Sequence, residues 1–151
     1  MVTKHINKVV LITGGAKRVG AAICRSLHAD GFNLMIHYKS SIKEARSLQA
    51  ELSLQRPNSV AIIQGDLLNI ASLPNLISET ISHFGRLDVL INNASTYYPT
   101  EIGEIDESKW QDLVGSNLKA PLFLSQAAAP ELRKNLGCIV NITDMHVERP
   151  K

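Results

Sequence analysis

Residues 8–20 read KVVLITGGAKRVG, in which a continuous apolar run passes directly into a glycine-rich turn. A run of this kind is typical of a strand that is buried on both faces of a parallel sheet. The residues that follow are apolar at positions 19, 22, 23 and 27, which is a helical period, and Gly31 ends the helix. The stretch therefore predicts a strand, a tight turn and a helix in immediate succession.

The same alternation of short β-branched runs and helical stretches continues along the chain. We expect strands at 8–13, 32–38, 59–65, 87–92 and 138–143, and helices at 19–30, 42–55, 69–84 and 106–135, the last bent at Pro121 or divided in two. This alternation predicts an α/β fold, with a doubly wound parallel sheet in three αβα layers, Rossmann-like and truncated after its fifth strand. The length fits one domain, residues 1–151.

The composition excludes several classes of protein. Apolar residues make up 44% of the chain and charged residues 20%, so a disordered or fibrous protein is excluded. A formal charge of +2 argues against nucleic acid, and no apolar run approaches the roughly 18 residues of a membrane span. The first apolar run leads into the turn without a cleavage site, so we expect no signal peptide. Cys24 and Cys138 form no CxxC motif and the histidines lack metal-ligand spacing, so we expect reduced thiols, no metal and a cytoplasmic location.

The glycine-rich turn is suited to a dinucleotide. Glycines allow the backbone to approach a pyrophosphate, which the exposed N–H groups at the helix N-terminus then bind. A plain tight turn is the alternative, but a position after the first strand of an alternating chain favours a dinucleotide site. The predicted contacts in the turn are Gly14, Lys17, Arg18, Val19 and Gly20.

The end of the second predicted strand distinguishes the two nicotinamide dinucleotides. A free ribose 2′-hydroxyl usually meets a carboxylate at this place, but residues 31–43 contain no Asp or Glu. A cation and two hydroxyls are present instead, which suits a 2′-phosphate, so we predict NADPH as the cofactor. A solvated loop is the alternative. The predicted contacts here are His37, Tyr38, Lys39, Ser40 and Ser41.

Polar residues also follow the other strands, at the edge where ligands of doubly wound sheets bind. Asp66, with Leu67 beside it, either binds an adenine amino group or caps the next helix. Residues 93–95 are small enough to leave room for ribose and nicotinamide. Tyr97 either stacks on a planar heterocycle or packs within its loop. Asp144 either relays a proton and holds a polar substrate or caps the segment that follows.

These motifs resemble those of the short-chain dehydrogenases/reductases and, more narrowly, of the pteridine reductases. Residues 13–20 resemble the TGxxxGxG turn of the family, with Arg18 in place of the middle glycine, a form typical of pteridine reductases. Residues 37–41 resemble their second-strand terminus, and Asn92-Asn93-Ala94-Ser95 resembles the NNAG motif in an NNAS form. The resemblance covers the whole chain.

The resemblance also implies roles for individual residues. Ser95 is implied to contact both cofactor and pterin, Tyr97 to stand where an aromatic side chain stacks on the pterin ring, and Arg18 to contact the substrate as well as the pyrophosphate. Asn117 resembles the catalytic asparagine of the family, which holds a proton-relay water. Asp144 aligns with the catalytic serine, at a position where pteridine reductases use aspartate.

The activity implied by the resemblance is the NADPH-dependent reduction of a small molecule, a pterin or dihydropterin, by a protein whose full-length relatives are homotetramers. The YxxxK pair of the family is expected beyond Lys151, so we interpret residues 1–151 as an N-terminal part that is inactive alone and leaves an apolar edge at 138–143. A truncated protein, a partial sequence and an interrupted reading frame all fit this interpretation. A non-catalytic dinucleotide-binding fragment and a reductase of another carbonyl compound are the alternatives.

Overall fold

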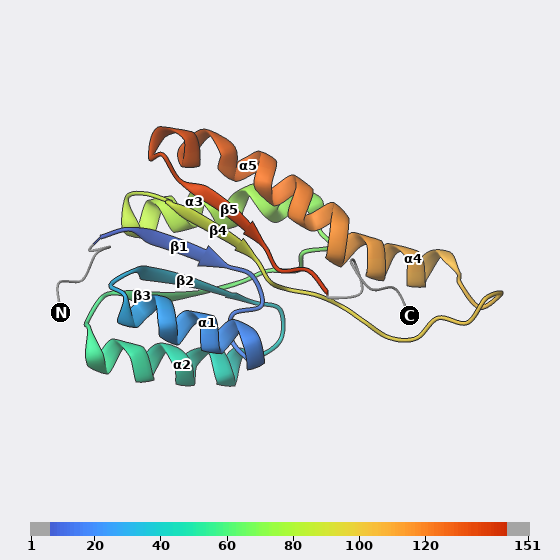
Figure 1. Cartoon of the computed structure of the whole chain (residues 1–151), viewed down its shortest axis with the longest axis horizontal. Coiled ribbons are helices and arrows are strands. Elements are labelled where there is room, and N and C mark those ends of the chain that lie inside the picture. The colour runs from blue at the N-terminus through green and yellow to red at the C-terminus, as the bar shows by residue number, and fades with distance from the viewer. Residues whose placement is uncertain (1–6, 145–151) are drawn as a thin grey trace.

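The computed structural model describes residues 7–144, which form a five-stranded parallel sheet with helices on both faces (Figure 1). The strand order is β3-β2-β1-β4-β5, so the predicted doubly wound sheet is confirmed. The strands are β1 (Val9–Ile12), β2 (Asn33–Tyr38), β3 (Val60–Gln64), β4 (Val89–Asn92) and β5 (Cys138–Asn141). The helices are α1 (Arg18–Ala29), α2 (Ile42–Gln55), α3 (Leu73–Phe84), α4 (Glu107–Val114) and α5 (Ala120–Lys134), with a 3-10 turn, η1 (Ile70–Ser72), before α3.

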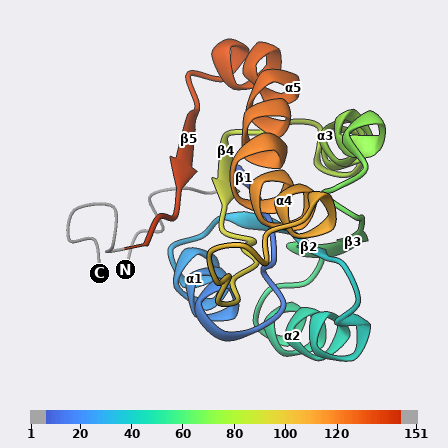
Figure 2. The ribbon, with the colours of Figure 1, turned by 90° about the vertical axis from the view of Figure 1, so that its right-hand side faces the viewer.

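The helices form two layers that the sheet separates, as Figure 2 shows. On one face, Cys24 of α1 and Leu48 of α2 belong to a buried cluster with Ile12. On the other face, Leu124 of α5 belongs to a cluster with Leu11 and with residues of α3. Leu11 and Ile12 are neighbours in β1, so their side chains alternate between the two faces. Because the connections turn in opposite directions from β1 and β4, a crevice is expected between the carboxyl ends of these strands.

The long helix predicted over residues 106–135 is interrupted by a π-helical segment, η2 (Gly115–Lys119), between α4 and α5. The interruption lies before Pro121, the predicted position of a bend. Pro121 instead occupies the first turn of α5, where the backbone N–H that proline lacks has no partner within the helix. None of the helices within residues 7–144 has the length and apolar character needed to cross a membrane.

β5 forms one edge of the sheet. It pairs in parallel with β4, with Ile139 opposite Leu90. Its side chains are exposed: Ile139 and Val140 are 38% and 40% exposed, and Ile142, directly after the strand, is 46% exposed. The apolar edge predicted from the sequence is therefore present in the described chain, and such an edge offers unpaired backbone groups to another strand.

Candidate functional site

Two glycines shape the turn between β1 and α1. Gly14 has a φ of +61°, and a Cβ at this position would lie 3.0 Å from the backbone of Ala94. A Cβ on Gly20 would collide with the carbonyl oxygen of Gly14, so a larger residue would push the first turn of α1 away from the loop. No side chain caps the N-terminus of α1, where Lys17 is the cap residue. The positive end of the helix is therefore left for a ligand.

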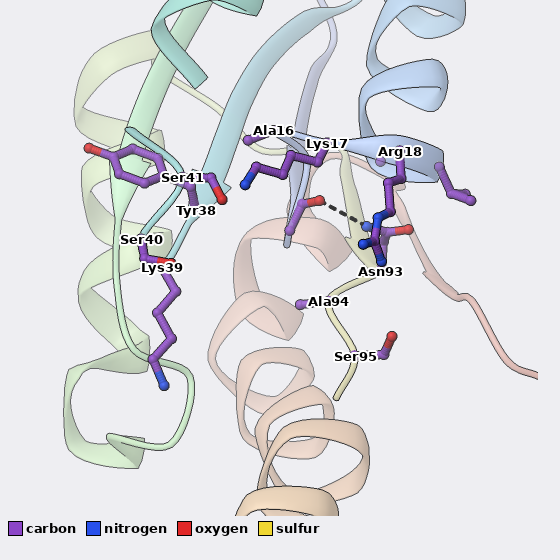
Figure 3. Close-up of a pocket in the computed structure, with 13 residues that line it drawn as sticks. Ala16, Lys17, Arg18, Tyr38, Lys39, Ser40, Ser41, Asn93, Ala94 and Ser95 are labelled. Atoms are coloured by element: carbon purple, nitrogen blue, oxygen red, sulfur yellow. Dashed lines mark hydrogen bonds between the residues drawn. The ribbon is translucent and has the colours of Figure 1, made fainter. Parts of the chain in front are cut away.

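The loop that follows β4 is hydrogen-bonded to this turn. Thr13 Oγ1 accepts the backbone N–H groups of Asn93 and Ala94, each at 3.0 Å. Asn93 Nδ2 donates to the carbonyl oxygens of Thr13 at 2.9 Å and of Gly14 at 3.2 Å, the second of which is drawn in Figure 3. Because Thr13 is only 1% exposed, water does not compete for these bonds. These hydrogen bonds therefore join the ends of β1 and β4.

A pocket of about 450 Å³ opens between this turn and the end of β2 (Figure 3). Three of the residues that line the pocket are cationic, and no lining residue is acidic. The turn and the end of β2 supply these cations from opposite walls of the pocket. The lining residues are Gly14, Ala16, Lys17, Arg18, Val19, Gly20, Tyr38, Lys39, Ser40, Ser41, Asn93, Ala94 and Ser95.

Each lysine of the pocket is paired with an acid that does not line it. Lys17 Nζ lies 2.8 Å from Glu44 Oε1, and Lys39 Nζ lies 3.0 Å from Asp66 Oδ2. The hydrogen bond from Lys17 lowers the pKa of Glu44. Burial acts to raise the pKa of Asp66, but the hydrogen bonds from Lys39 and from a backbone N–H outweigh it and lower the pKa. All four side chains are about half exposed, and ion pairs at that exposure are weak, so a phosphate can replace either carboxylate.

Three of the predicted cofactor contacts do not line this pocket. His37 is only 2% exposed, and its ring is hydrogen-bonded to backbone groups beneath the turn. Leu67 is 8% exposed and belongs to the cluster between the sheet and α3 and α5. Asp66 accepts the backbone N–H of Leu68 at 3.1 Å in a local turn, and it does not cap the next helix, because the cap residues are Asn69 for η1 and Ser72 for α3.

A second cleft, of about 500 Å³, lies at the carboxyl ends of β4 and β5 and shares residues 93–95 with the first. It brings together Asn117 and Asp144, which lie far apart in the sequence. Tyr97 is 83% exposed at this cleft. The lining residues are Asn92, Asn93, Ala94, Ser95, Thr96, Tyr97, Asn117, Pro121, Asn141, Ile142, Thr143 and Asp144.

Asn117 lies in the π-helical segment and joins it to the loop after β4. Its Oδ1 accepts the N–H of Thr96 at 3.1 Å, and its Nδ2 donates to the carbonyl oxygen of Thr96 at 2.7 Å. Thr96 Oγ1 also donates to Ser116 Oγ at 3.3 Å. These bonds hold the loop that carries Ser95 and Tyr97 against the helix. π-Helical segments frequently occur at functional sites, and this one positions a wall of the cleft.

Sequence reasoning missed Thr13 and Glu44. The threonine precedes the two glycines directly, but its bonds to residues 93 and 94 depend on strands that are distant in the sequence. Glu44 follows the acid-free stretch 31–43 immediately, and the helical turn from Ser41 brings it to Lys17. Within residues 7–144, no group of three or more His, Cys, Asp or Glu side chains is placed to hold a metal ion.

Known proteins are similar in sequence to this chain over nearly its whole length. The family model for short chain dehydrogenase matches residues 8–150. Pteridine reductase 1 of Leishmania tarentolae is 36% identical over 188 aligned positions, which cover 99% of this chain and 65% of that protein. A 3-oxoacyl-(acyl-carrier-protein) reductase of Staphylococcus aureus is 30% identical over 141 residues, covering 93% of this chain and 57% of that protein. An L-fucose dehydrogenase of Mus musculus is 35% identical over 145 residues, covering 95% and 51%.

The chain spans about half to two thirds of the length of these curated relatives. The match nevertheless includes every described strand, the turn after β1, the loop after β4 and the π-helical segment. The glycine-shaped turn and the two adjoining clefts occupy the crevice at the carboxyl ends of the parallel strands. The chain belongs to the short-chain dehydrogenase family.

Proposed function

We propose that the protein binds NADPH and, within its full-length form, uses it to reduce a pterin or dihydropterin. The observation that carries the choice of cofactor is the lining of the first pocket, which contains three cations and three serines but no carboxylate. The choice of substrate is supported by the 36% identity to a pteridine reductase and by the Arg18, Ser95 and Asp144 departures from the general family pattern.

The residues present fit a dinucleotide. A Cβ on Gly14 would press against Ala94 and a Cβ on Gly20 would collide with the carbonyl oxygen of Gly14, so glycine at both positions keeps the turn tight and supports the approach of its backbone to a pyrophosphate at the start of α1. Lys17 and Arg18 supply positive charge at that place. Lys39 supplies the positive charge that a 2′-phosphate needs, and Ser40 and Ser41 supply hydroxyl donors.

The second cleft provides the substrate side of the proposal. Tyr97 exposes its aromatic ring there, and such a surface stacks on a planar heterocycle. Ser95 lines both clefts and can contact both ligands. Asp144 offers a carboxyl group to a polar edge of the substrate or holds a proton for it. NADPH, when bound, supplies the hydride, and Asn117 keeps the loop of the cleft in place so that the substrate is held at reacting distance.

The activity is tested with the full-length gene product by following NADPH oxidation in the presence of biopterin or dihydrobiopterin. We expect turnover with at least one pterin and faster oxidation of NADPH than of NADH. Turnover of simple ketones or acyl-carrier thioesters alone would contradict the pterin assignment. A folded protein that binds neither dinucleotide would contradict the entire proposal.

The cofactor assignment has a separate test in Lys39→Asp. Replacing the cation by a carboxylate is expected to weaken NADPH binding about tenfold while leaving NADH binding equal or tighter, because a 2′-hydroxyl donates a hydrogen bond to a carboxylate. Lys8→Asp is the matched control, since Lys8 is exposed at the opposite end of β1 and the substitution changes the net charge equally. Calorimetric titration of both variants with both dinucleotides gives the comparison. An equal effect of the two substitutions would exclude a direct role for Lys39.

A reductase of another carbonyl compound is the second candidate. The observation that favours it is the 30–35% identity to a 3-oxoacyl-(acyl-carrier-protein) reductase and to an L-fucose dehydrogenase, close to the 36% for the pteridine reductase. The cofactor pocket is compatible with both candidates. Parallel assays with a 3-oxoacyl thioester and with L-fucose distinguish them, because only the pterin reaction is expected to respond to Tyr97→Ala through loss of stacking.

A further inference from the structure

The ring of His37 lies beneath the turn that forms the first pocket. His37 is buried, at 2% exposure. Nδ1 lies 3.3 Å from the backbone nitrogen of Gly14, and Nε2 lies 3.1 Å from the carbonyl oxygen of Gly65. The backbone of His37 also binds the turn, because the N–H of Gly15 donates to the carbonyl oxygen of His37 at 3.0 Å. One residue of β2 therefore joins the turn after β1 to the connection after β3.

The two partners of the ring determine its protonation state. A backbone N–H can only donate, so Nδ1 must carry a lone pair towards Gly14. A carbonyl oxygen can only accept, so Nε2 must carry the proton towards Gly65. Only the neutral ring with its proton on Nε2 satisfies both groups. A cationic ring would place an N–H group against the N–H of Gly14.

We propose that neutral His37 is a positioning residue for the dinucleotide, which it never touches, because its Nδ1 fixes the N–H of Gly14 and with it the backbone of the turn. The inference rests on the proposed cofactor function. Gly14 has a positive φ, as Arg18 does further along the turn, and the carbonyl oxygen of Gly14 accepts a hydrogen bond from the Asn93 side chain. Losing the bond to His37 would loosen the turn at this point and leave a partly buried N–H without a partner.

The groups packed around the ring keep it neutral near pH 7. β3 places Ile63 opposite His37, and Leu76 of α3 packs against the adjoining glycine, Gly65. Within residues 7–144, the Asp66 carboxylate is the charge that acts on the ring, and it is itself paired with Lys39. Burial lowers the pKa of His37 and outweighs the opposing effects of Gly65 and Asp66.

The sign of the pH dependence follows from this arrangement. The required neutral form dominates above the ordinary histidine pKa of about 6.5 and is lost as the pH falls through the lower value of the folded state. Dinucleotide affinity should therefore be constant near neutrality and fall in acid. The 2′-phosphate of NADPH also titrates, near about pH 6, but its contribution is the same for every variant and cancels in their ratio.

Two amide substitutions separate the two bonds of the ring. The Oδ1 of an asparagine occupies the place of Nδ1 and can accept from Gly14, whereas a glutamine reaches the place of Nε2 and can donate only to Gly65. Neither side chain titrates. We expect His37→Asn to retain NADPH affinity within about threefold at pH 8 and to remove the acid-dependent loss, and His37→Gln to weaken binding about tenfold.

His28→Gln is the matched control. His28 is also buried, at 5% exposure, and its pKa is also lowered, but it lies in the last turn of α1 and contacts Ser59. Its substitution should leave the pH profile of NADPH binding unchanged. A second readout needs no cofactor: the imidazole ¹⁵N signals of His37 should show the Nε2–H tautomer, and the amide signal of Gly14 should shift as that ring titrates.

The outcomes separate this inference from the cofactor proposal. If the wild-type protein binds neither NADPH nor NADH, the proposed function fails and the positioning role fails with it. If the wild type binds NADPH but its pH profile equals that of His37→Asn, only the positioning role is overturned. Equal affinities of the asparagine and glutamine variants, or a Gly14 signal that ignores the titration of His37, would overturn it as well. If the glutamine variant does not fold, the pH profile of NADPH binding by His37→Asn and the amide signal of Gly14 still test the positioning role.

Discussion

Arg18 begins α1 with a left-handed backbone, at a φ of +49°. The corresponding position in the general family turn carries glycine, which adopts this conformation without cost. A residue with a Cβ lowers the stability of the folded protein by about 1 kcal/mol in this conformation. Such strain persists where the surrounding structure or a function requires it. Arg18 lines the first pocket, so the strained backbone places a cation at the proposed dinucleotide site.

Two substitutions at this residue separate backbone strain from charge. Arg18→Gly should raise the free energy of unfolding by about 1 kcal/mol relative to Arg18→Ala, because alanine keeps the Cβ and therefore the strain. Both variants should bind NADPH about tenfold more weakly than the wild type, since both lack the guanidinium. Urea unfolding and calorimetric titration measure the two effects. Equal stability of the glycine and alanine variants would mean that the backbone is not strained.

The cations of the pocket could be predicted from the sequence, whereas the place of His37 could not. Lys17, Lys39 and their neighbours follow strands directly, and parallel strands bring their carboxyl ends to one edge. Within β2, however, side chains alternate, so adjacent His37 and Tyr38 face opposite sides of the sheet. Tyr38 lines the pocket and His37 lies under the turn. Which face carries the pocket depends on the placement of α1, which a single sequence does not give.

The two cysteines, both predicted to be free thiols, differ in reactivity. Cys24 has no exposed surface, and burial raises the pKa of its thiol to about 12 against the smaller opposing effect of Arg25. Cys138 is exposed on β5. We expect one thiol to react with a disulfide reagent in native protein near pH 8 and two in denaturant. Cys138→Ser should abolish the native reaction, and rapid reaction of that variant would show that Cys24 is accessible.

Among the elements, the helix that carries Asn117 departs most from the sequence-based expectation. α2 begins and ends at the predicted residues, 42 and 55, because local signals alone define it. The π-helical segment Gly115–Lys119 has no local signal of comparable strength. It coincides with a close approach, since a Cβ on Gly115 would lie 2.6 Å from the side chain of Leu68, and with the bonds from Asn117 to Thr96. Contacts with distant residues therefore shape this element, and its presence could not be predicted.

The junction between β1 and the loop after β4 provides a test at the scale of elements. Thr13→Val preserves the shape of the side chain but removes the oxygen that accepts two backbone N–H groups. Leaving these partly buried donors without a partner should lower the free energy of unfolding by about 2–3 kcal/mol. Thr13→Ser keeps the oxygen and should cost less than about 1 kcal/mol. Urea unfolding compares the two variants, and a valine variant as stable as the serine variant would show that water satisfies both donors.

At the scale of the whole molecule, buried histidines lie at two distant places. His37 lies under the turn at the carboxyl ends of the strands, and His28 lies in the last turn of α1, where its Nε2 is 2.7 Å from Ser59 Oγ. Burial lowers the pKa of both, and the charge of Arg56 adds to the effect on His28. The folded protein therefore binds fewer protons than the unfolded chain just below the ordinary histidine pKa, and global stability depends on pH in that range.

Stability should be constant above about pH 7 and decrease as the pH falls through about 6.5 towards the depressed folded values. The slope is at most about 1.4 kcal/mol per pH unit for each extra proton that the unfolded chain binds. A further loss is expected only below about pH 4.5, where the ion-paired Glu44 and Glu51, whose pKa values are lowered by Lys17 and Arg25, take up protons. The urea midpoint measured from about pH 8 to about pH 3 checks this prediction, with the His28→Gln, His37→Asn double variant as its control. The double variant should lose the first decrease and retain the second, and an unchanged first decrease would assign it to groups other than the buried histidines.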